Sequence, residues 1–433
     1  MLNRCKIAQC LILAFFFTFF MTLTRPCYVQ DKPPVNVRTS RGASFDLAQA
    51  VREATENSTV KIPAGTYALR APLVIKKSVT LEGANAGKPQ SEVVIKCDRT
   101  NAIFISADKV CLRNLHVKLS EKVNVSNSDG ADDFELEVDD SNSRGYADRN
   151  EDVLPSFLED QLSSKGKDNS FAAVRITGGN LTVENCFIEG ESKVTSQKYR
   201  DEQRGLQITG ASSHLTLKNS QITCLDTGVL IAEGATGVMT DCHFEYNGNA
   251  FGVLTKGSLE CDKITATRNF NGAMFSNHAK SVVRNSSFTK NWNVNMGVMA
   301  IGPVTVGELR IEDTNFAHST KGLMTVAAPC SAINCEFSNH YEGGVLVAKS
   351  TLRMDQCKFH DNKCGVNAIR ESKLIMKKCA LNGGQYGVDA LGSQIVVSES
   401  LFSDIGEAVR AVDSVVSEKN NMFENNINDV VKR

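Results

Sequence analysis

Residues 335–359, CEFSNHYEGGVLVAKSTLRMDQCKF, contain one full period of the pattern that decides the fold. A small residue, Cys335, stands two positions before a bulky one, Phe337, and the pair returns 22 residues later as Cys357 and Phe359. Side chains two positions apart on a β-strand point to the same face, so we expect both members of each pair to point inward. Between the pairs lie a polar turn, glycines and two short strand-like segments.

The same spacing organises most of the chain. The bulky position falls at Ile188, Ile222, Phe244, Ile264, Phe288, Phe316, Phe337, Phe359, Leu381, Phe402 and Phe423. A small residue stands two positions earlier at Cys186, Ser220, Cys242, Ser286, Thr314, Cys335, Cys357, Cys379 and Ser400. Three short strands per repeat of about 22 residues, without a helical period, predict a solenoid of stacked β-coils. Helical repeats need roughly 30 to 45 residues, and a propeller blade needs about twice the observed length.

Composition agrees with a folded solenoid. The 433 residues are 42% apolar and 22% charged, which excludes a disordered chain. Stacked coils share one continuous core, so we expect residues 44–433 to form a single domain despite their number. The net charge of −1 does not indicate a nucleic-acid-binding protein, and we expect no nucleic-acid partner.

The N-terminal 24 residues differ from the rest. Arg4 and Lys6 precede the apolar run 7–23, a pattern typical of a secretory signal. We therefore expect export to the periplasm, the cell surface or the medium, with 25–43 as a linker. An uncleaved membrane anchor is the alternative, because 17 residues are at the short limit for a membrane span. Any contact with a membrane is expected through this segment alone.

A short helix is expected to cover the N-terminal end of the solenoid. Its predicted range is 45–56, with Ser44 as the N-cap. The apolar residues at helical spacing are Leu47, Ala50, Val51 and Ala54. Such a helix would protect the unpaired edges of the first strands. The strands that follow are expected at 60–62, 73–75, 79–81, 93–95, 103–105 and 110–112.

Two segments near the N-terminus, 62–67 (IPAGTY) and 78–84 (SVTLEGA), carry a family resemblance together with the Asn-Cys-x-Phe type of repeat. Over about 44–430, the chain resembles the right-handed parallel β-helix proteins of the pectate-lyase-like superfamily. The resemblance implies an all-β, right-handed parallel β-helix with a short N-terminal capping helix. It implies no particular activity, because this superfamily includes lyases, hydrolases, epimerases and non-catalytic binding proteins.

Two insertions interrupt the repeat. Residues 121–168 contain 14 Asp or Glu and 5 Lys or Arg, which gives a local net charge of −9 and leaves +8 on the remainder. We expect this acidic stretch to be mobile. The second insertion spans 191–204. Aligning Val117 with Ile188 places both insertions in the same turn of neighbouring coils.

The cysteines are interpreted as packing residues. Cys186, Cys242, Cys335, Cys357 and Cys379 occupy the small inward position that Ser and Thr occupy elsewhere, so we expect buried thiols. The alternative is a local disulfide in the pair Cys330/Cys335 or the pair Cys357/Cys364. The sequence contains neither Cys-x-x-Cys nor the Cys/His spacing of a zinc site, and we expect no metal and no cofactor.

A polar ladder is expected one residue before these small positions. Its members are Asn185, Asn219, Asp241, Asn285, Asp313 and Asn334. Stacked amides can bond to one another along a bend of the coil, because each has donors and an acceptor. We interpret Asp241 and Asp313 as members of this ladder and not as catalytic carboxylates.

The catalytic segments of related enzymes are missing. A polygalacturonase-like site would need paired aspartates with Gly-His-Gly and Arg-Ile-Lys segments. The Asp-Asp pairs, 132–133 and 139–140, both lie in the acidic insertion, and 310–312 reads Arg-Ile-Glu. The Trp-x-Asp-His and Arg-x-Pro-x-x-Arg segments of pectate lyases are also absent. The sequence therefore assigns no catalytic residue and leaves open whether the protein is an enzyme.

The turn after the bulky inward position is the candidate binding strip. Aromatic, charged and amide residues recur there on successive coils, and the candidate binding residues are Asp226, Tyr246, Arg268, Lys290, Trp292, Tyr341 and Tyr386. Rings and polar groups in a row suit an extended polysaccharide. The positive balance outside the acidic insertion favours an anionic polysaccharide. The alternatives are a polysaccharide lyase or glycoside hydrolase with a divergent site, and a scaffold that binds a protein partner.

Overall fold

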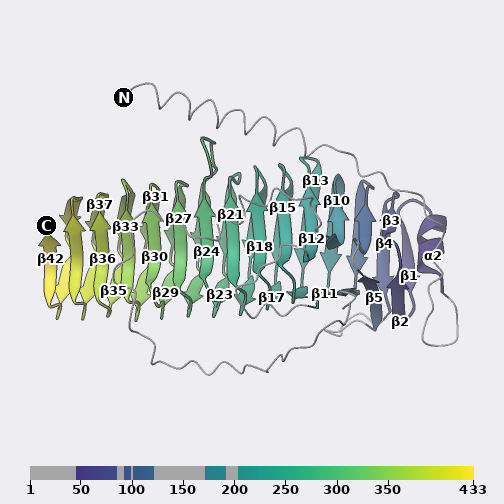
Figure 1. Ribbon diagram of the computed structural model, residues 1–433, viewed down its shortest axis with the longest axis horizontal. Coiled ribbons are helices and arrows are strands. Elements are labelled where there is room, and N and C mark those ends of the chain that lie inside the picture. Colours follow the sequence, from purple (N-terminus) through teal and green to yellow (C-terminus); the bar gives the residue numbers. More distant parts are fainter. Residues whose placement is uncertain (1–44, 85–91, 99–100, 121–170, 192–202) are drawn as a thin grey trace, which may run out of the picture. The chain divides into compact units, whose positions relative to one another are not determined.

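The computed structural model describes residues 45–84, 92–98, 101–120, 171–191 and 203–433. These residues form three parallel sheets of 14 strands, which we call sheets A, B and C. Within each sheet a strand pairs with the strand three elements later, so the chain passes through A, B and C once per coil (Figure 1). The fold is a right-handed parallel β-helix, as the sequence predicts.

Sheet A contains the first strand of each coil. Its strands are β1 (Ser58–Ile62), β4 (Val79–Gly83), β7 (Lys109–Arg113), β10 (Gly179–Glu184), β13 (Ser213–Lys218), β16 (Thr236–Thr240), β19 (Ser258–Asp262), β22 (Ser281–Arg284), β25 (Leu309–Glu312), β28 (Cys330–Ile333), β31 (Thr351–Asp355), β34 (Lys373–Lys377), β37 (Gln394–Ser398) and β40 (Val415–Lys419).

Sheet B has short strands from β11 onward and carries the bulky inward residues. Its strands are β2 (Gly65–Leu69), β5 (Val93–Asp98), β8 (His116–Ser120), β11 (Phe187–Glu189), β14 (Gln221–Thr223), β17 (His243–Glu245), β20 (Thr265–Thr267), β23 (Ser287–Thr289), β26 (Asn315–Ala317), β29 (Glu336–Ser338), β32 (Lys358–His360), β35 (Ala380–Asn382), β38 (Leu401–Ser403) and β41 (Met422–Glu424).

Sheet C completes each coil. Its strands are β3 (Leu73–Ile75), β6 (Ile103–Ile105), β9 (Phe171–Ile176), β12 (Gln203–Thr209), β15 (Thr227–Ala232), β18 (Asn249–Leu254), β21 (Asn271–Ser276), β24 (Val294–Met299), β27 (Lys321–Val326), β30 (Gly343–Ala348), β33 (Cys364–Ile369), β36 (Tyr386–Leu391), β39 (Glu407–Val412) and β42 (Asn428–Lys432). The six strands predicted near the N-terminus lie within β1, β3, β4, β5, β6 and β7.

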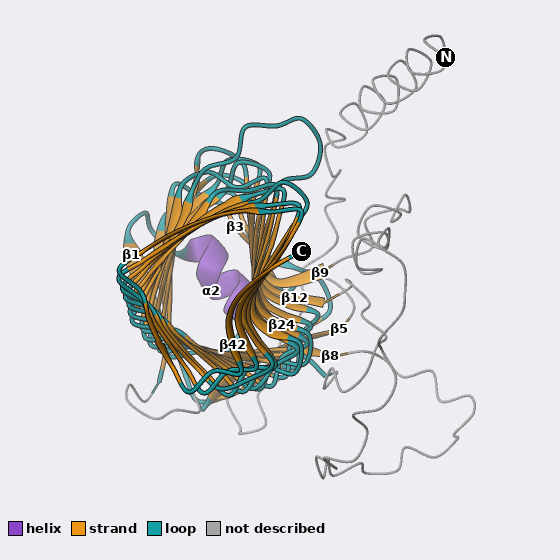
Figure 2. Cartoon of the chain, turned by 90° about the vertical axis from the view of Figure 1, so that its left-hand side faces the viewer, coloured by secondary structure: helices purple, strands orange, loops and turns teal. Residues whose placement is uncertain are grey.

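One continuous core fills the space between the three sheets. The view along the solenoid axis shows how the sheets enclose this space (Figure 2). Phenylalanines of sheet B stack on one another through this core. The ring centroids of Phe316 and Phe337 are 4.9 Å apart with an interplanar angle of 7°, and those of Phe337 and Phe359 are 5.0 Å apart. Such pairs stabilise a protein by about 0.5–1.5 kcal/mol beyond the burial of their area.

The predicted bulky column is wrong at one coil. The strand register aligns Phe244 with Ala266 and Ala266 with Phe288, so Ile264 does not stand in this column. Ile264 lies two residues earlier, where the other coils have Cys, Ser or Thr, and both Ile264 and Ala266 are buried. A large and a small residue have exchanged positions, which conserves the core volume. With Ala266 in place, the neighbouring coils become equal in length.

The small inward column is buried, as predicted. Cys335, Cys357 and Cys379 are free thiols inside the core, and each sulfur donates to a backbone carbonyl. Cys330 and Cys364 are also free thiols, so neither local disulfide considered from the sequence is present. Burial raises the pKa of the Cys330 thiol above its ordinary value and raises the pKa of Cys364 to about 12.

The capping helix is shorter than predicted. It is α2 (Leu47–Glu53), and its N-cap is Asp46, whose carboxylate accepts a hydrogen bond from the backbone N–H of Gln49 at 3.0 Å. The predicted N-cap, Ser44, lies outside the described residues. Leu47 and Val51 join the core, so the helix covers its N-terminal end as expected.

Both predicted insertions begin in the same kind of turn. Ile188 pairs with Val117, so β11 follows β8 directly in sheet B. The first insertion joins β8 to β9 and the second joins β11 to β12, which are neighbouring pairs of strands. The first inserted segment, residues 192–202 of the second, and the predicted leader and linker lie outside the described residues. The second insertion ends earlier than predicted, because Gln203 and Arg204 already belong to β12. None of the described helices is long and apolar enough to span a membrane.

Candidate functional site

The turns from sheet B to sheet C carry the predicted binding strip, and we call this row of turns, from 224–226 to 425–427, the BC edge. Their first residue has a left-handed backbone in most coils, with φ of 57° at Tyr246, 54° at Arg268 and 56° at Lys290. Their second residue points inward and is buried in most coils. The following residue is at the tip of the turn. The repeat therefore places the successive residues of each turn in three distinct environments.

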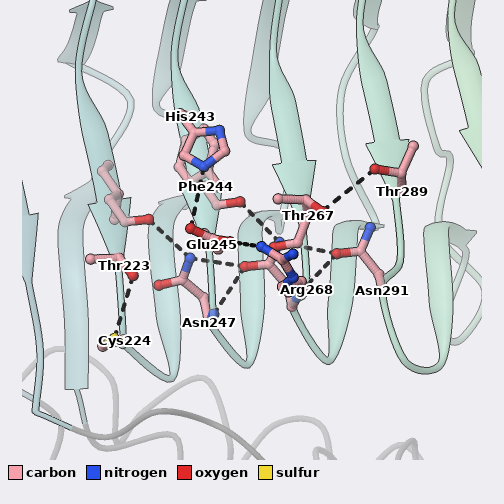
Figure 3. A network of polar contacts seen from close by, with 12 residues as sticks. Thr223, Cys224, His243, Phe244, Glu245, Asn247, Thr267, Arg268, Thr289 and Asn291 are labelled. Carbon is pink, nitrogen blue, oxygen red and sulfur yellow. Dashed lines mark hydrogen bonds and ion pairs between the residues drawn. The ribbon is translucent and has the colours of Figure 1, made fainter. Parts of the chain in front are cut away.

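The buried second position forms an amide ladder. The Oδ1 of Asn269 accepts from the backbone N–H of Asn247 at 2.9 Å, and the Oδ1 of Asn291 accepts from the backbone N–H of Asn269 at 3.0 Å. The side-chain amides also donate along the same row (Figure 3). These bonds tie three successive turns together without solvent. The BC edge is therefore held rigidly at this point.

The polar ladder predicted from the sequence lies in a different turn and forms in part. Asn185, Asn219, Asp241, Asn285, Asp313 and Asn334 occupy the turn from sheet A to sheet B, where each has a left-handed backbone with φ between 46° and 53°. One bond of the predicted kind joins two of these residues, from Asn334 Nδ2 to Asp313 Oδ1 of the preceding coil at 2.6 Å, and it is exposed. Asn tolerates this conformation better than most residues. The conformation of the turn explains the amides there, and the stacking interaction lies in the BC edge.

Trp292 and Tyr341 project from the BC edge. Their exposed fractions are 50% and 61%, in a fold whose other large aromatic side chains are mostly buried. Each follows directly after a buried turn residue, Asn291 and His340 respectively. The structure thus places both aromatic residues on the surface, on the edge that the sequence predicts.

His340 supports the turn below Tyr341. Its Nδ1 lies 3.0 Å from Ser319 Oγ, its Nε2 lies 3.2 Å from the carbonyl oxygen of Phe316, and its backbone N–H donates to Asn362 Oδ1. Burial lowers the pKa of His340 to about 4, so the ring is neutral at neutral pH. A neutral, fully bonded imidazole acts here as one more rung of the internal ladder.

Tyr246 and Arg268 lie together on the N-terminal part of the edge. The guanidinium carbon of Arg268 is 5.9 Å from the centroid of the Tyr246 ring. Nη1 of Arg268 is 2.6 Å from Glu245 Oε1 (Figure 3). The Glu245 partner was not predicted from the sequence, because it comes from the preceding coil and only the register reveals it.

Tyr386 and Asp226 are less available than Trp292 and Tyr341. The guanidinium carbon of Arg410 lies 3.9 Å from the centroid of the Tyr386 ring, and Arg410 also forms two hydrogen bonds to Asp389. Asp226 is 6% exposed, and its carboxylate accepts from the backbone N–H of Gln203 at 2.7 Å. Lys290, in contrast, is an exposed residue in the turn of Trp292.

The described residues contain no cluster of three or more His, Cys, Asp or Glu side chains that could hold a metal ion. The acidic groups near the edge are instead held in separate ion pairs, such as Lys321 with Glu342. The geometry of the edge suits binding through rings and hydrogen bonds. It assembles no pair of carboxylates with an evident acid–base role.

The three sheets and the regular turns between them define a repeat protein built of stacked β-coils. The family described as "Right handed beta helix region" matches this chain over 157–294, 204–353 and 304–432, more than half of its length. The chain belongs to this right-handed β-helix family. No curated protein sequence gives a significant match.

Solved structures with a similar fold include two carbohydrate-active proteins. The periplasmic alginate epimerase AlgG is 10% identical, with a TM-score of 0.54 over 92% of this chain and 95% of that chain. The catalytic unit of a GH87 α-1,3-glucanase from Streptomyces thermodiastaticus is 14% identical, with a TM-score of 0.53 over 92% of this chain and 69% of that chain. At such identities the likeness shows the fold alone.

Proposed function

We propose that this chain is an exported protein that binds an extended polysaccharide along the BC edge. The observation that supports the proposal most directly is the exposure of Trp292 and Tyr341 on one edge of a rigid solenoid. Aromatic rings stack on the apolar faces of sugars, and nearby charged groups such as Lys290 can bond to hydroxyl or carboxylate groups.

The support below the rings strengthens the proposal. Asn291 and His340 are buried and fully engaged, and each directly precedes one of the two rings. A ring that is held in place before binding loses less conformational entropy when the ligand arrives. Proteins with this fold include an epimerase that acts on alginate and a glucanase, which makes a polysaccharide ligand a natural class to test first.

The test removes both rings. Trp292→Ala with Tyr341→Ala should weaken polysaccharide binding on a glycan array on the order of tenfold or more, since each stacking contact is worth about 1 kcal/mol. Ile427→Ala is the matched control, because Ile427 is 82% exposed in the same kind of turn on the last coil. The thermal unfolding midpoint should change little in either variant.

The same samples separate the alternatives. Formation of new reducing ends or unsaturated uronate would show that the protein is an enzyme. Unaltered binding of the folded double variant across a broad panel would exclude the edge as the glycan site and favour a protein-binding scaffold.

A further inference from the structure

The turns that carry Trp292 and Tyr341 are longer than their neighbours. Each has four residues between its strands, 290–293 and 339–342. The other described BC turns from β14 onward have three, namely 224–226, 246–248, 268–270, 318–320, 361–363, 383–385, 404–406 and 425–427. The two exposed aromatic rings of the edge therefore coincide with its two one-residue insertions.

The additional residue of each turn lies directly after the exposed ring. On the side of sheet B, Thr289 pairs with Ala317, and Ala317 pairs with Ser338. On the side of sheet C, Lys321 pairs with both Val294 and Gly343. The register is thus regular on both sides. The backbone N–H groups of Trp292 and Tyr341 donate to the carbonyl oxygens of Asn269 and Ser319, so each ring stands level with the tip of its neighbour and the extra residue follows it, before the strand of sheet C. At the tips of the adjacent three-residue turns, Phe270 and Thr320 are half-buried, whereas Trp292 and Tyr341 project.

The two long turns are separated by exactly one coil, which carries Thr320 at its tip. Stacked coils are about 4.8 Å apart, so the two rings are spaced by roughly 10 Å along the solenoid axis. The spacing is fixed, because the backbone N–H of Tyr341 bonds to Ser319 O and Thr320 Oγ1 bonds to Trp292 O.

We infer that the BC edge selects glycans that form an extended two-fold ribbon, lying parallel to the solenoid axis with one sugar per coil. This inference rests on the proposed function. In a chain of pyranoses joined by equatorial bonds at positions 1 and 4, each sugar advances by nearly the spacing of one coil and is turned by half a rotation. The same sugar face therefore returns at every second sugar, and Trp292 and Tyr341 stack on sugars n and n+2.

The intervening coil contacts sugar n+1. Thr320 is at its tip, and next to it Lys321 forms an ion pair with Glu342 of the Tyr341 turn. These groups can donate to and accept from ring hydroxyls, but none of them is a stacking platform. A chain with axial or 1,3 linkages bends, so its sugar faces do not return at this spacing and only one ring can stack at a time.

The experiment is calorimetric titration of the full chain with oligosaccharides of defined length. Cellohexaose or mannohexaose should bind at least about tenfold more tightly than maltohexaose or laminarihexaose, since the bent chains lose one stacking contact and part of the polar contacts. Within the cello or manno series, affinity should rise sharply between two and three sugars. Equal affinity for extended and bent hexamers, or no increase at three sugars, would overturn the inference.

A variant pair tests the spacing directly. Tyr341→Ala with Thr320→Tyr keeps two rings but places them on adjacent coils, and it should abolish the preference for extended chains. Tyr341→Phe keeps the stacking ring in place and should retain both the affinity and the preference for extended chains. This second variant tests the inference even if the double variant does not fold. Ring-dependent binding without linkage preference would contradict this inference and leave the proposed function intact. Absence of binding to every glycan would contradict both.

Discussion

Side-chain volume explains the inward positions residue by residue. The small inward column that contains Cys186, Cys335 and Cys357 holds a thiol or a hydroxyl in most coils. At Ile264 it holds a larger side chain, and there the next inward residue is the small Ala266. Cys and Ser are similar in size, and a buried thiol behaves as a small apolar group. The cysteines of this column therefore need no role beyond packing, even in a chain predicted to be exported.

The thiols Cys335, Cys357 and Cys379 should accordingly remain reduced in the folded protein. They lie on successive coils inside the core, where an oxidant has no access. The check is alkylation under denaturing, non-reducing conditions followed by mass spectrometry. Recovery of these three residues as disulfides would contradict the packing interpretation.

The sequence predicted the inward columns but not the buried ladder of the BC edge, and the reason is physical. A period of about 22 residues fixes which residues are equivalent between coils, so the Phe and Cys columns follow from it. It does not distinguish a turn whose Asn is left-handed and exposed, as at Asn285, from one whose Asn points inward, as at Asn269. Likewise, the spacing predicted Trp292 and Tyr341 on the edge. It did not predict that Arg410 covers Tyr386, because this contact depends on where the two side chains lie on the paired strands β36 and β39.

The asparagines of the BC edge and those of the turns from sheet A to sheet B differ in how much they contribute to stability. In the BC edge, Asn269 is fully buried, and its amide donates to the carbonyl oxygens of Phe244 and Thr267 and to Asn291 Oδ1. In the turn from sheet A to sheet B, Asn285 makes one exposed bond, to Asp262. Only the first site would leave buried groups without partners after substitution.

Asn269→Ala should therefore lower the free energy of unfolding by at least about 2 kcal/mol, because the backbone N–H of Asn247 and the carbonyl oxygen of Phe244 lose their bonds. Asn285→Gly should cost less than about 1 kcal/mol, since glycine keeps the left-handed turn and only a surface bond is lost. Denaturant unfolding of the two variants measures both values. Similar losses at the two sites would mean that the inner ladder is not the stronger one.

For the whole molecule, one coil after another repeats the same three strands, and this is why so much of the fold could be predicted without a template. The repeat also makes the coil stack insensitive to what is inserted between its strands. The two insertions leave the pairing of β8 with β11 and of β9 with β12 undisturbed. A long segment that departs between Ser120 and Phe171 therefore need not contribute to the core.

Replacing 121–168 by a short Gly-Ser linker should leave cooperative unfolding intact and should change ligand choice through charge alone. The segment carries −9, so its removal changes the net charge from −1 to +8. A positive body attracts anionic polysaccharides over long range, and the attraction is screened as salt rises. We expect tighter binding of an anionic polysaccharide at low ionic strength, a gain that shrinks by 0.5 M salt, where the Debye length falls to a few ångströms. Binding of a neutral oligosaccharide of equal length should not change.

A loss of several kcal/mol in the free energy of unfolding would place the segment in the core. Equal gains in affinity for neutral and anionic chains would show that the segment acts by blocking the edge and not by its charge.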